Sequence, residues 1–292
     1  MHSNAVVSLL PSATEIVFAI GAGDQLVGVT HECDYPDAAL SLPRLTTSAL
    51  PPYDSAAEID RHVRRNLHAG SSLYALDAEL LERLAPDLII TQELCAVCAV
   101  SYDIVARAAR RLSSDPRIVS LEPSSLEDVF STIVTLGRLT NRTSSAADLV
   151  SALRARVDAV VARCTQRRPS VLVLEWTDPP MSGGHWTPEL VELAGGIPVL
   201  SNPGKNSTVL AWEQIVAADP DTIVVAPCGF DLKRTQHAMA ELQGLAPWRS
   251  LRAVRAARAH AVDGNAYVNR PGPRLIDTIE IFANLFASSV PA

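Results

Sequence analysis

The sequence predicts an α/β protein of two lobes, each with a parallel sheet, joined by one long rigid α-helix. Three observations predict this fold class: short apolar runs alternate with helical patterns, one strand motif occurs in both halves, and a single long helical pattern separates the halves. With 292 residues, the chain also exceeds the size at which one hydrophobic core usually stops growing. We therefore predict an N-terminal α/β lobe over residues 1–123, a helical bridge over 124–166 and a C-terminal α/β lobe over 167–292.

The bridging helix is predicted from Ser144 to Cys164. Its apolar residues recur at steps of three and four, which is the period of one helix face. They are Leu149, Leu153, Val157, Val160 and Cys164. Ser145 and Asp148 have the spacing of a capping box. About 20 residues rising about 1.5 Å each make a rod of roughly 30 Å, about the width of a small domain. We expect this rod to hold the two lobes at a fixed separation.

Strands and helices alternate in both lobes. In the first, apolar runs predict strands at 5–10, 26–29, 87–91 and 118–121, and helical patterns occupy 12–20, 55–68, 77–85, 100–112 and 126–139. Ser12 and Glu15 have capping-box spacing at the start of the first helix. In the second lobe, strands are predicted at 171–175, 199–200, 221–226 and 259–262, and helices at 188–194, 212–218 and 273–286. Residues 176–186 are rich in glycine and proline, and we interpret them as a loop.

The two lobes resemble each other in sequence. Ala85-Pro-Asp-Leu-Ile-Ile90 matches Asp219-Pro-Asp-Thr-Ile-Val224, and glycines end a helix in each half, at Gly21–Gly23 and Gly195–Gly196. The spacing is not constant, because the first half carries an extra segment from Leu45 to Ala75. We therefore predict a duplicated, Rossmann-like lobe and not a solenoid.

Composition and charge exclude several classes of protein. The chain is 48% hydrophobic and 20% charged, as in ordinary globular proteins, and its net charge of −7 argues against nucleic-acid binding. One basic run, Arg249, Arg252, Arg255 and Arg258, is interpreted as the solvated face of a short helix. No run of 18 apolar residues predicts a membrane span.

The N-terminal residues do not have the pattern of a signal peptide, so we expect a cytoplasmic protein, or a periplasmic one if a leader has been removed. The five cysteines are an odd number and widely spread, which favours free thiols in a reducing compartment. We expect a monomer.

The unusual residues follow the predicted strands. In open parallel sheets, ligands bind at the carboxyl ends of the strands, and if the two lobes face each other these loops line one ligand cleft. The candidate ligand-binding residues are His31, Tyr35, Cys95, Cys98, Trp176, His185, Trp186, Cys228, Tyr267, Asn269 and Arg270.

Each candidate also has a purely structural interpretation. Cys95 and Cys98 have the two-residue gap of a zinc or redox pair, but without a second such pair they are more simply two packed thiols. Trp176 and Trp186 are either core residues or aromatic surface for a flat ligand. Asn269 and Arg270, with Asn265, suit amides or carboxylates but equally suit the fixing of their own loop. His185 is isolated in sequence.

No catalytic motif is found. The chain lacks a GxSxG elbow, a Walker A loop, a GxGxxG sequence after a strand and an HExxH sequence. A nucleophilic pair of a cysteine (Cys95, Cys98 or Cys228) with His31 or His185 remains a minor alternative.

Several segments resemble a known family. Val7-Ser-Leu-Leu-Pro-Ser-Ala-Thr-Glu15, Ala85-Pro-Asp-Leu-Ile-Ile-Thr91, the bridging helix and the segment from Asp263-Gly-Asn to Arg270-Pro-Gly-Pro-Arg274 resemble the cobalamin-binding proteins of ABC importers. These belong to the periplasmic-type binding proteins for cobalamin, haem and iron-siderophores. The resemblance implies two lobes joined by one rigid helix, a shallow ligand cleft between them, and no catalysis.

The resemblance also suggests a subgroup and some site residues. His31-Glu-Cys-Asp-Tyr-Pro36, Cys95-Ala-Val-Cys98 and Gly184-His-Trp186 resemble cobalamin-binding members without signal peptides. The resemblance implies that the ligand is bound by five loop residues: Tyr35, Trp176, Trp186, Tyr267 and Arg270.

We therefore expect non-catalytic binding of cobalamin or a related corrinoid in the cleft, for uptake, storage or intracellular handling. An ABC importer permease is the expected partner if the chain is exported. One alternative is a protein that binds a metal or metal chelate (haem, siderophore or zinc) through Cys95, Cys98, His31 and Cys228. Another is a small-molecule enzyme that uses a cleft cysteine.

Overall fold

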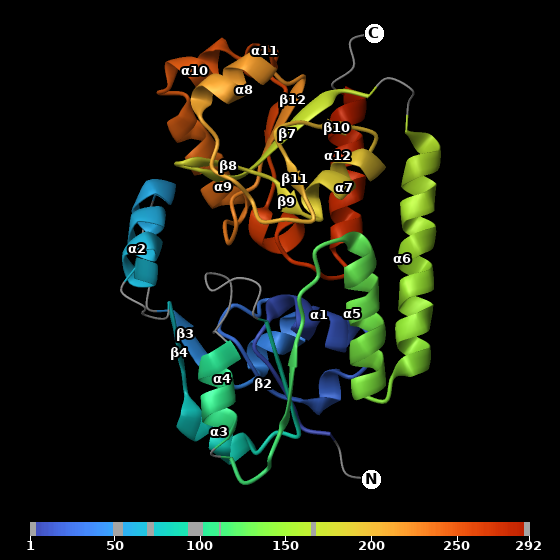
Figure 1. Ribbon diagram of the computed structural model, residues 1–292. Helices are drawn as coiled ribbons and strands as arrows, with labels where there is room; N and C mark the ends of the chain where they lie inside the picture. The colour runs from blue at the N-terminus through green and yellow to red at the C-terminus, as the bar shows by residue number, and fades with distance from the viewer. Residues whose placement is uncertain are drawn as a thin grey trace. The chain divides into compact units, whose positions relative to one another are not determined.

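The computed structural model describes residues 4–48, 55–68, 73–92, 102–110, 112–164 and 168–288, and it divides into two compact units (Figure 1). The N-terminal unit comprises Met1–Tyr53, Arg61–Glu122 and Phe130–Ser151. The C-terminal unit comprises Asp54–Asp60, Pro123–Val129 and Ala152–Ala292. No helix in the described ranges is both long and apolar enough to span a membrane.

The N-terminal unit is built on a parallel sheet with strand order β2-β1-β5-β6. Its strands are β1 (Val6–Ser8), β2 (Leu26–Val29), β5 (Leu88–Thr91) and β6 (Arg117–Ser120). Its helices are α1 (Pro11–Ala19), α3 (Ala78–Leu84), α4 (Tyr102–Ala109) and most of α5 (Leu126–Leu139), with short turns η1 (Gly23–Gln25) and η2 (Asp37–Ser41). Val7 and Ile89 from the central strands pack with Leu81 from α3 and Val105 from α4, and all four are fully buried. The helices therefore cover the sheet, as the apolar strands require.

A short antiparallel pair completes this unit. It consists of β3 (Thr46–Ser48) and β4 (Tyr74–Leu76), and α2 (Ala56–His68) lies between them in sequence. Leu45 and Leu73, just before these two strands, are fully buried in the same core as the main sheet. The extra segment of the first half is thus attached to the sheet by apolar packing.

The C-terminal unit contains a parallel sheet of order β10-β7-β12-β13, with β8 added antiparallel to β7. Its strands are β7 (Ser170–Thr177), β8 (Pro180–Ser182), β10 (Ile197–Pro198), β12 (Thr222–Val225) and β13 (Ala259–Ala261), and a separate parallel pair is formed by β9 (Gly184–His185) and β11 (Asn202–Pro203). Its helices are α7 (Thr187–Leu193), α8 (Trp212–Ala218), α9 (Leu232–Leu242), α10 (Ala246–Ser250), α11 (Arg252–Arg255) and α12 (Leu275–Ser288), with a π-helical turn η3 (Gly264–Val268).

The duplication predicted from sequence is present in the structure. Among the four parallel strands of each main sheet, taken in chain order, the first lies between the second and the third, and the fourth pairs with the third. The matched motifs also act alike. Asp87 accepts a hydrogen bond from the N–H of Ala5, just before β1, at 2.8 Å, and Asp221 accepts one from the N–H of Ser170, the first residue of β7, at 2.9 Å. The aspartate before the third strand therefore ties down the start of the first strand in both units.

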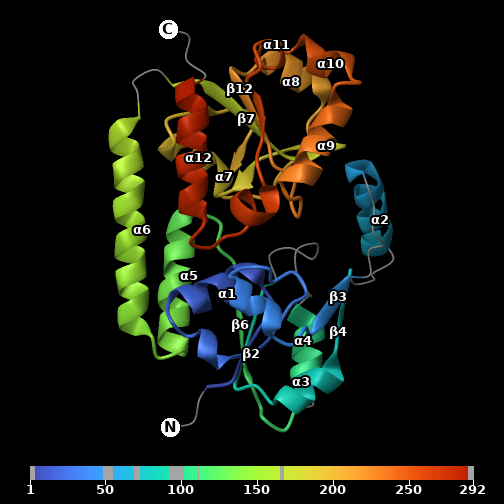
Figure 2. The ribbon, with the colours of Figure 1, turned by 180° about the vertical axis from the view of Figure 1, so that it is seen from behind.

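The long helix α6 spans Thr143–Arg163 and runs from one unit into the other, since the boundary falls between Ser151 and Ala152. Figures 1 and 2 show α12 alongside the second half of α6. Arg156 of α6 bonds Asp277 of α12 at 2.6 Å and Glu280 at 2.9 Å. These ion pairs attach the second half of α6 to the C-terminal unit.

Several local predictions were wrong. Both capping boxes fail because the helices begin earlier: Ser145 lies inside α6, and α1 begins at Pro11, with Leu10 as an N-cap that makes no side-chain bond. The predicted loop 176–186 contains β8 and β9, which exist only through pairing with other segments. The strand predicted at 199–200 lies at Ile197–Pro198 instead.

Candidate functional site

In the N-terminal unit, His31 lies two residues beyond the end of β2 and is fixed by two threonines. Its Nδ1 is 2.7 Å from the hydroxyl oxygen of Thr46, and its own backbone N–H donates to that oxygen at 3.0 Å. The Thr30 and Thr46 hydroxyls are 2.7 Å apart. The imidazole also lies against the Tyr74 ring, with centroids 5.6 Å apart and planes inclined by 48°. Position and orientation of His31 are therefore both restrained.

Arg44 organises the loop that carries His31. Its guanidinium donates to the carbonyl oxygens of Thr30 at 2.9 Å and Cys33 at 2.7 Å. Burial, together with the Arg44 charge, lowers the pKa of His31. The histidine is therefore neutral at physiological pH.

The other predicted residues of this unit differ in exposure. Tyr35 is 47% exposed and follows directly on the same loop, before a cis peptide bond to Pro36. Cys33 is buried, with its sulfur 3.0 Å from the Thr14 hydroxyl. Cys95 and Cys98 lie outside the described residues. The structure thus brings His31 and Tyr35 to one loop.

In the C-terminal unit, Trp176 forms an aromatic cluster at the end of β7. Its ring meets that of Phe230 edge to face, with centroids 5.3 Å apart, and its indole N–H donates to the Asp178 carbonyl at 3.1 Å. Ala56 and Ile59, from the first turns of α2, pack against the same cluster. Trp176 remains partly accessible, so it combines a fixed orientation with exposed apolar surface.

Glu175, beside Trp176, is a polar centre that sequence reasoning missed. Its carboxylate accepts hydrogen bonds from the Thr187 hydroxyl at 2.6 Å, the Gly184 N–H at 3.3 Å and the Ser207 hydroxyl. It lies in a β-bulge, because the pairing of β7 with β8 skips from Leu174 to Trp176. Burial raises the pKa of Glu175, and the three hydrogen bonds oppose that rise. The signal in the sequence was a lone carboxylate ending an apolar strand.

His185 and Trp186 are held by the structure around them. His185 has a left-handed backbone (φ 45°), its Nε2 is 2.9 Å from the side-chain oxygen of Asn206, and its ring stacks on Trp186 with centroids 5.5 Å apart. Trp186 is only 8% exposed, and its indole N–H donates to the Val268 carbonyl at 2.9 Å. Its indole is a packing residue here, with little surface left for a ligand.

The last group of predicted residues surrounds η3. Asn269 donates to the carbonyls of Ala226 at 2.9 Å and Gly264 at 3.1 Å. Arg270 is 6% exposed and donates to the Asn265 side chain at 2.9 Å. Asn269 and Arg270 therefore fix their own loop. Tyr267, in η3, is partly exposed, and the Arg274 guanidinium lies 5.7 Å from its ring centroid.

The thiols do not form a metal centre within the described ranges. Cys228 is exposed, and its backbone N–H donates to the Glu175 carbonyl at 3.1 Å. No group of three His, Cys, Asp or Glu side chains that could hold a metal ion occurs among the residues that the structure describes.

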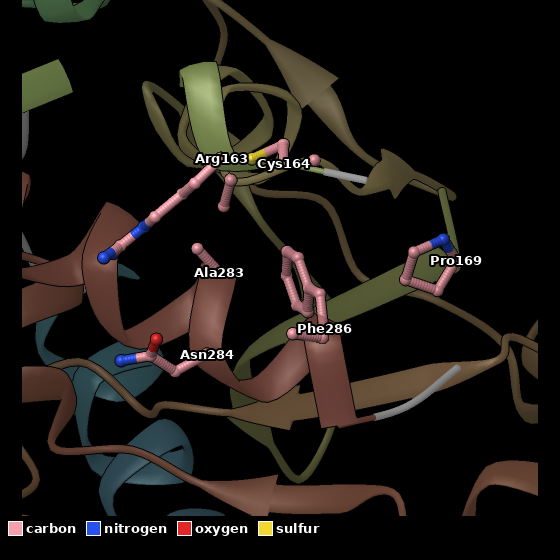
Figure 3. A pocket seen from close by; sticks show the side chains of 9 residues that line it. Arg163, Cys164, Pro169, Ala283, Asn284 and Phe286 are labelled. Carbon is pink, nitrogen blue, oxygen red and sulfur yellow. The ribbon is translucent and has the colours of Figure 1, made fainter. Parts of the chain in front are cut away.

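A cavity of about 140 Å³ in the C-terminal unit lies apart from all these residues (Figure 3). It is lined by the end of α6 at Arg163 and Cys164, by Gly195, and by Ala283 and Phe286 of α12. Small-molecule sites are usually about 300 to 1,000 Å³, so this cavity is too small for a tetrapyrrole.

Two curated relatives align with almost the whole chain. The vitamin B12-binding protein of Vibrio cholerae is 22% identical over 286 residues, which cover 94% of this chain and 86% of the relative. The cobalamin-binding protein of Halobacterium salinarum is 24% identical over 287 residues, covering 96% of this chain and 69% of the relative.

Solved structures share the fold. The periplasmic vitamin B12-binding protein of Vibrio cholerae has a TM-score of 0.70 at 21% identity, covering 98% of this chain and 97% of that one. The periplasmic haem-binding protein of Roseiflexus sp. RS-1, in its apo form, has a TM-score of 0.73 at 23% identity, covering 98% and 99%. The same two-lobed fold therefore occurs in proteins that are named for different ligands, vitamin B12 in one case and haem in the other.

The family follows from the match over most of the chain. A family model described as periplasmic binding protein matches residues 6–264. Proteins of this kind bind small-molecule ligands for ABC importers and do not convert them, so the chain is a substrate-binding protein and not an enzyme. With its duplicated α/β units and the long helix between them, this chain belongs to the periplasmic binding protein family.

Proposed function

We propose that this chain binds cobalamin or a related corrinoid, without converting it, at the strand-end loops of its two units. The observation that carries the proposal is the pairing of accessible aromatic side chains with fixed polar groups at those loops. Trp176 and Tyr267 offer partly exposed rings in one unit, and Tyr35 and His31 do so in the other. The names of the Vibrio and Halobacterium relatives support a corrinoid as the ligand.

A corrinoid suits this chemistry. Its flat macrocycle presents apolar faces, which aromatic rings cover with a gain of about 25 cal/mol per Å² of apolar surface removed from water. Its edge carries amides, which need hydrogen-bond partners when they leave water. The loops supply both kinds of group, and several of them are held in place before a ligand arrives, as for Trp176 by the Asp178 carbonyl. Pre-fixed groups lower the entropic cost of binding.

The biological role follows the ligand. We propose that the chain delivers a corrinoid to an ABC importer permease if it is exported, and stores or hands on a corrinoid if it acts inside the cell. Cell fractionation of the native host separates the two roles, because delivery to an importer requires the protein outside the cytoplasmic membrane.

Replacing Trp176 tests the proposed site. The Trp176→Ala variant is expected to bind cyanocobalamin about tenfold more weakly, because it loses about 1.4 kcal/mol of stacking and apolar contact. Trp212→Ala is the matched control, since Trp212 is also a partly buried indole of this unit but packs against Trp248, with ring centroids 6.4 Å apart. Isothermal calorimetry gives both affinities. Equal affinity in wild type and Trp176→Ala, with both folded, would remove Trp176 from the site.

A further inference from the structure

One nitrogen of His31 is engaged by the protein. Nδ1 lies 2.7 Å from the Thr46 hydroxyl, and the hydroxyls of Thr46 and Thr30 lie 2.7 Å apart. When Nδ1–H donates to the Thr46 hydroxyl oxygen, the Thr46 hydroxyl in turn donates a hydrogen bond to the Thr30 oxygen, and the lone pair of the imidazole lies on Nε2. Histidines that bind metals in proteins are held in this way, with one ring nitrogen donating to an oxygen and the other free for the metal.

The other nitrogen is available. Within the described residues Nε2 has no hydrogen-bond partner. It is not one of the fully buried polar atoms that lack a partner, so some of its surface remains accessible. The ring cannot turn freely, because Tyr74 lies against it and the backbone N–H of His31 is bonded to Thr46. A fixed ring with an open Nε2 is a preorganised donor for a ligand atom.

Arg44 fixes the loop on both sides of His31. Its guanidinium donates to the carbonyl oxygen of Thr30, before His31, and to that of Cys33, after it. The backbone that carries the imidazole is therefore held in place before a ligand binds.

We propose that Nε2 of His31 coordinates the cobalt of a bound aquacobalamin by replacing its exchangeable axial water. The bond from cobalt to the water oxygen breaks, a bond from the imidazole lone pair to cobalt forms, and the water leaves. Cobalt remains Co(III), and no electron or proton is transferred. Thr46 is the positioning residue that orients the ring. This inference rests on the proposed corrinoid binding, and it makes His31 the residue that discriminates between corrinoids by their axial ligand.

The comparison of two ligands tests it. In cyanocobalamin, a tightly held cyanide occupies the axial position that aquacobalamin fills with water. Wild-type protein is expected to shift the near-ultraviolet band of aquacobalamin at about pH 7, as an imidazole nitrogen replaces water, and to leave that of cyanocobalamin in place. Wild type should also bind aquacobalamin more tightly than cyanocobalamin.

Variants assign the effect to His31. In His31→Gln the spectral shift should vanish, and this variant should bind aquacobalamin and cyanocobalamin with equal affinity, so that the preference of the wild type for aquacobalamin is lost. Thr46→Val should weaken aquacobalamin binding by about tenfold, with the shift retained at saturation. His237→Gln is the control: His237 lies on α9 and is exposed, so this variant should behave as wild type.

The outcomes separate this inference from the proposed function. Binding of both corrinoids with no shift for aquacobalamin overturns His31 ligation and leaves corrinoid binding intact. A shift that persists in His31→Gln also overturns it, because another group would then supply the nitrogen. Failure of the folded wild type to bind either corrinoid overturns both proposals.

Discussion

Glu175 joins three segments of the C-terminal unit through one carboxylate. The N–H of Gly184 in β9, the Thr187 hydroxyl at the start of α7 and the Ser207 hydroxyl after β11 all donate to it. It is also next to Trp176, the aromatic residue proposed to cover the ligand. A change at this carboxylate should therefore alter the loops that carry His185 and Trp176.

The Glu175 carboxyl predicts a specific pH dependence of stability. Burial raises its pKa in the folded protein, so its contribution to stability is complete below the ordinary value of 4.5 and is lost as the pH rises through the folded pKa. Glu175→Gln does not titrate, so its free energy of unfolding relative to wild type should rise between pH 4.5 and neutrality. All four tryptophans lie in the C-terminal unit, so tryptophan fluorescence during urea unfolding reports this unit.

The control for this measurement is Glu213→Gln, an exposed glutamate in the first turn of α8. This variant makes the same chemical change in the same unit, at a glutamate that makes none of the three hydrogen bonds of Glu175. Parallel pH profiles of wild type and Glu175→Gln would contradict the raised pKa of Glu175.

Single residues show where sequence reasoning stops. The sequence shows that Trp176 and Trp186 both lie in a Gly/Pro-rich stretch. Tertiary packing, which the sequence does not show, leaves Trp176 partly accessible and buries Trp186. The sequence is compatible with both ligand contact and loop support for Asn269 and Arg270, and their hydrogen bonds to Gly264 and Asn265 favour support. Thr46, Arg44 and Tyr74 were not candidates, because only contacts distant in sequence bring them to His31.

At the scale of elements, the two matched aspartates predict paired effects. Asp87→Ala leaves the N–H of Ala5 without its partner, and Asp221→Ala does the same to the N–H and hydroxyl of Ser170. Each loss should cost about 1 to 3 kcal/mol locally. Hydrogen exchange should therefore accelerate in β1 and β5 for the first variant, and in β7 and β12 for the second.

Each variant serves as the control for the other, and acid pH adds a check. Burial raises the pKa of Asp221, but bonds from Ser170 and the charges of Arg252 and Arg258 outweigh it, so the pKa is lowered overall. Its stabilisation is then present above the ordinary value of 3.8 and is lost as the pH falls through the folded pKa. Unchanged exchange in β7 and β12 of Asp221→Ala at neutral pH would refute this role.

Helices with a clear apolar period were predicted well, whatever their length. The structure confirms α5 at Leu126–Leu139 and α8 at Trp212–Ala218 with the predicted bounds, because their apolar faces repeat at helical period. The helix α9 at Leu232–Leu242 was not predicted. β8 and β9 have three and two residues, too few for any periodicity to show. Both capping boxes failed because the same residue spacing also occurs inside helices.

At the scale of the whole molecule, we predict that α6 acts as a rigid connection between the two units. One helix of 21 residues enters both units, and its second half is attached to α12 through Arg156. A continuous helix resists bending more than an irregular linker does. We therefore expect the separation of the two units to change little when a ligand binds.

Small-angle X-ray scattering measures this expectation. The radius of gyration should agree within error between the free protein and the protein saturated with cyanocobalamin. Hydroxocobalamin provides a second ligand for the comparison. A difference of several ångströms between the free and bound states would contradict a rigid connection.

Sequence alone was sufficient for the fold class and the family, because alternating strands and helices, the repeated motif and the long helix each leave a pattern along the chain. The ligand leaves no such pattern, since it is selected by side chains from loops far apart in sequence. Relatives with this fold are named for vitamin B12, and others for haem. Ligand identity is therefore a question for direct binding.

Corrinoid binding is tested by whether the purified protein retains the ligand. The purified protein at micromolar concentration is incubated separately with cyanocobalamin, hydroxocobalamin, haem and zinc, desalted, and examined by native mass spectrometry and absorption spectroscopy. We expect a one-to-one complex with each cobalamin and no complex of comparable occupancy with haem or zinc. Retention of haem or zinc alone, or of no ligand, would contradict it.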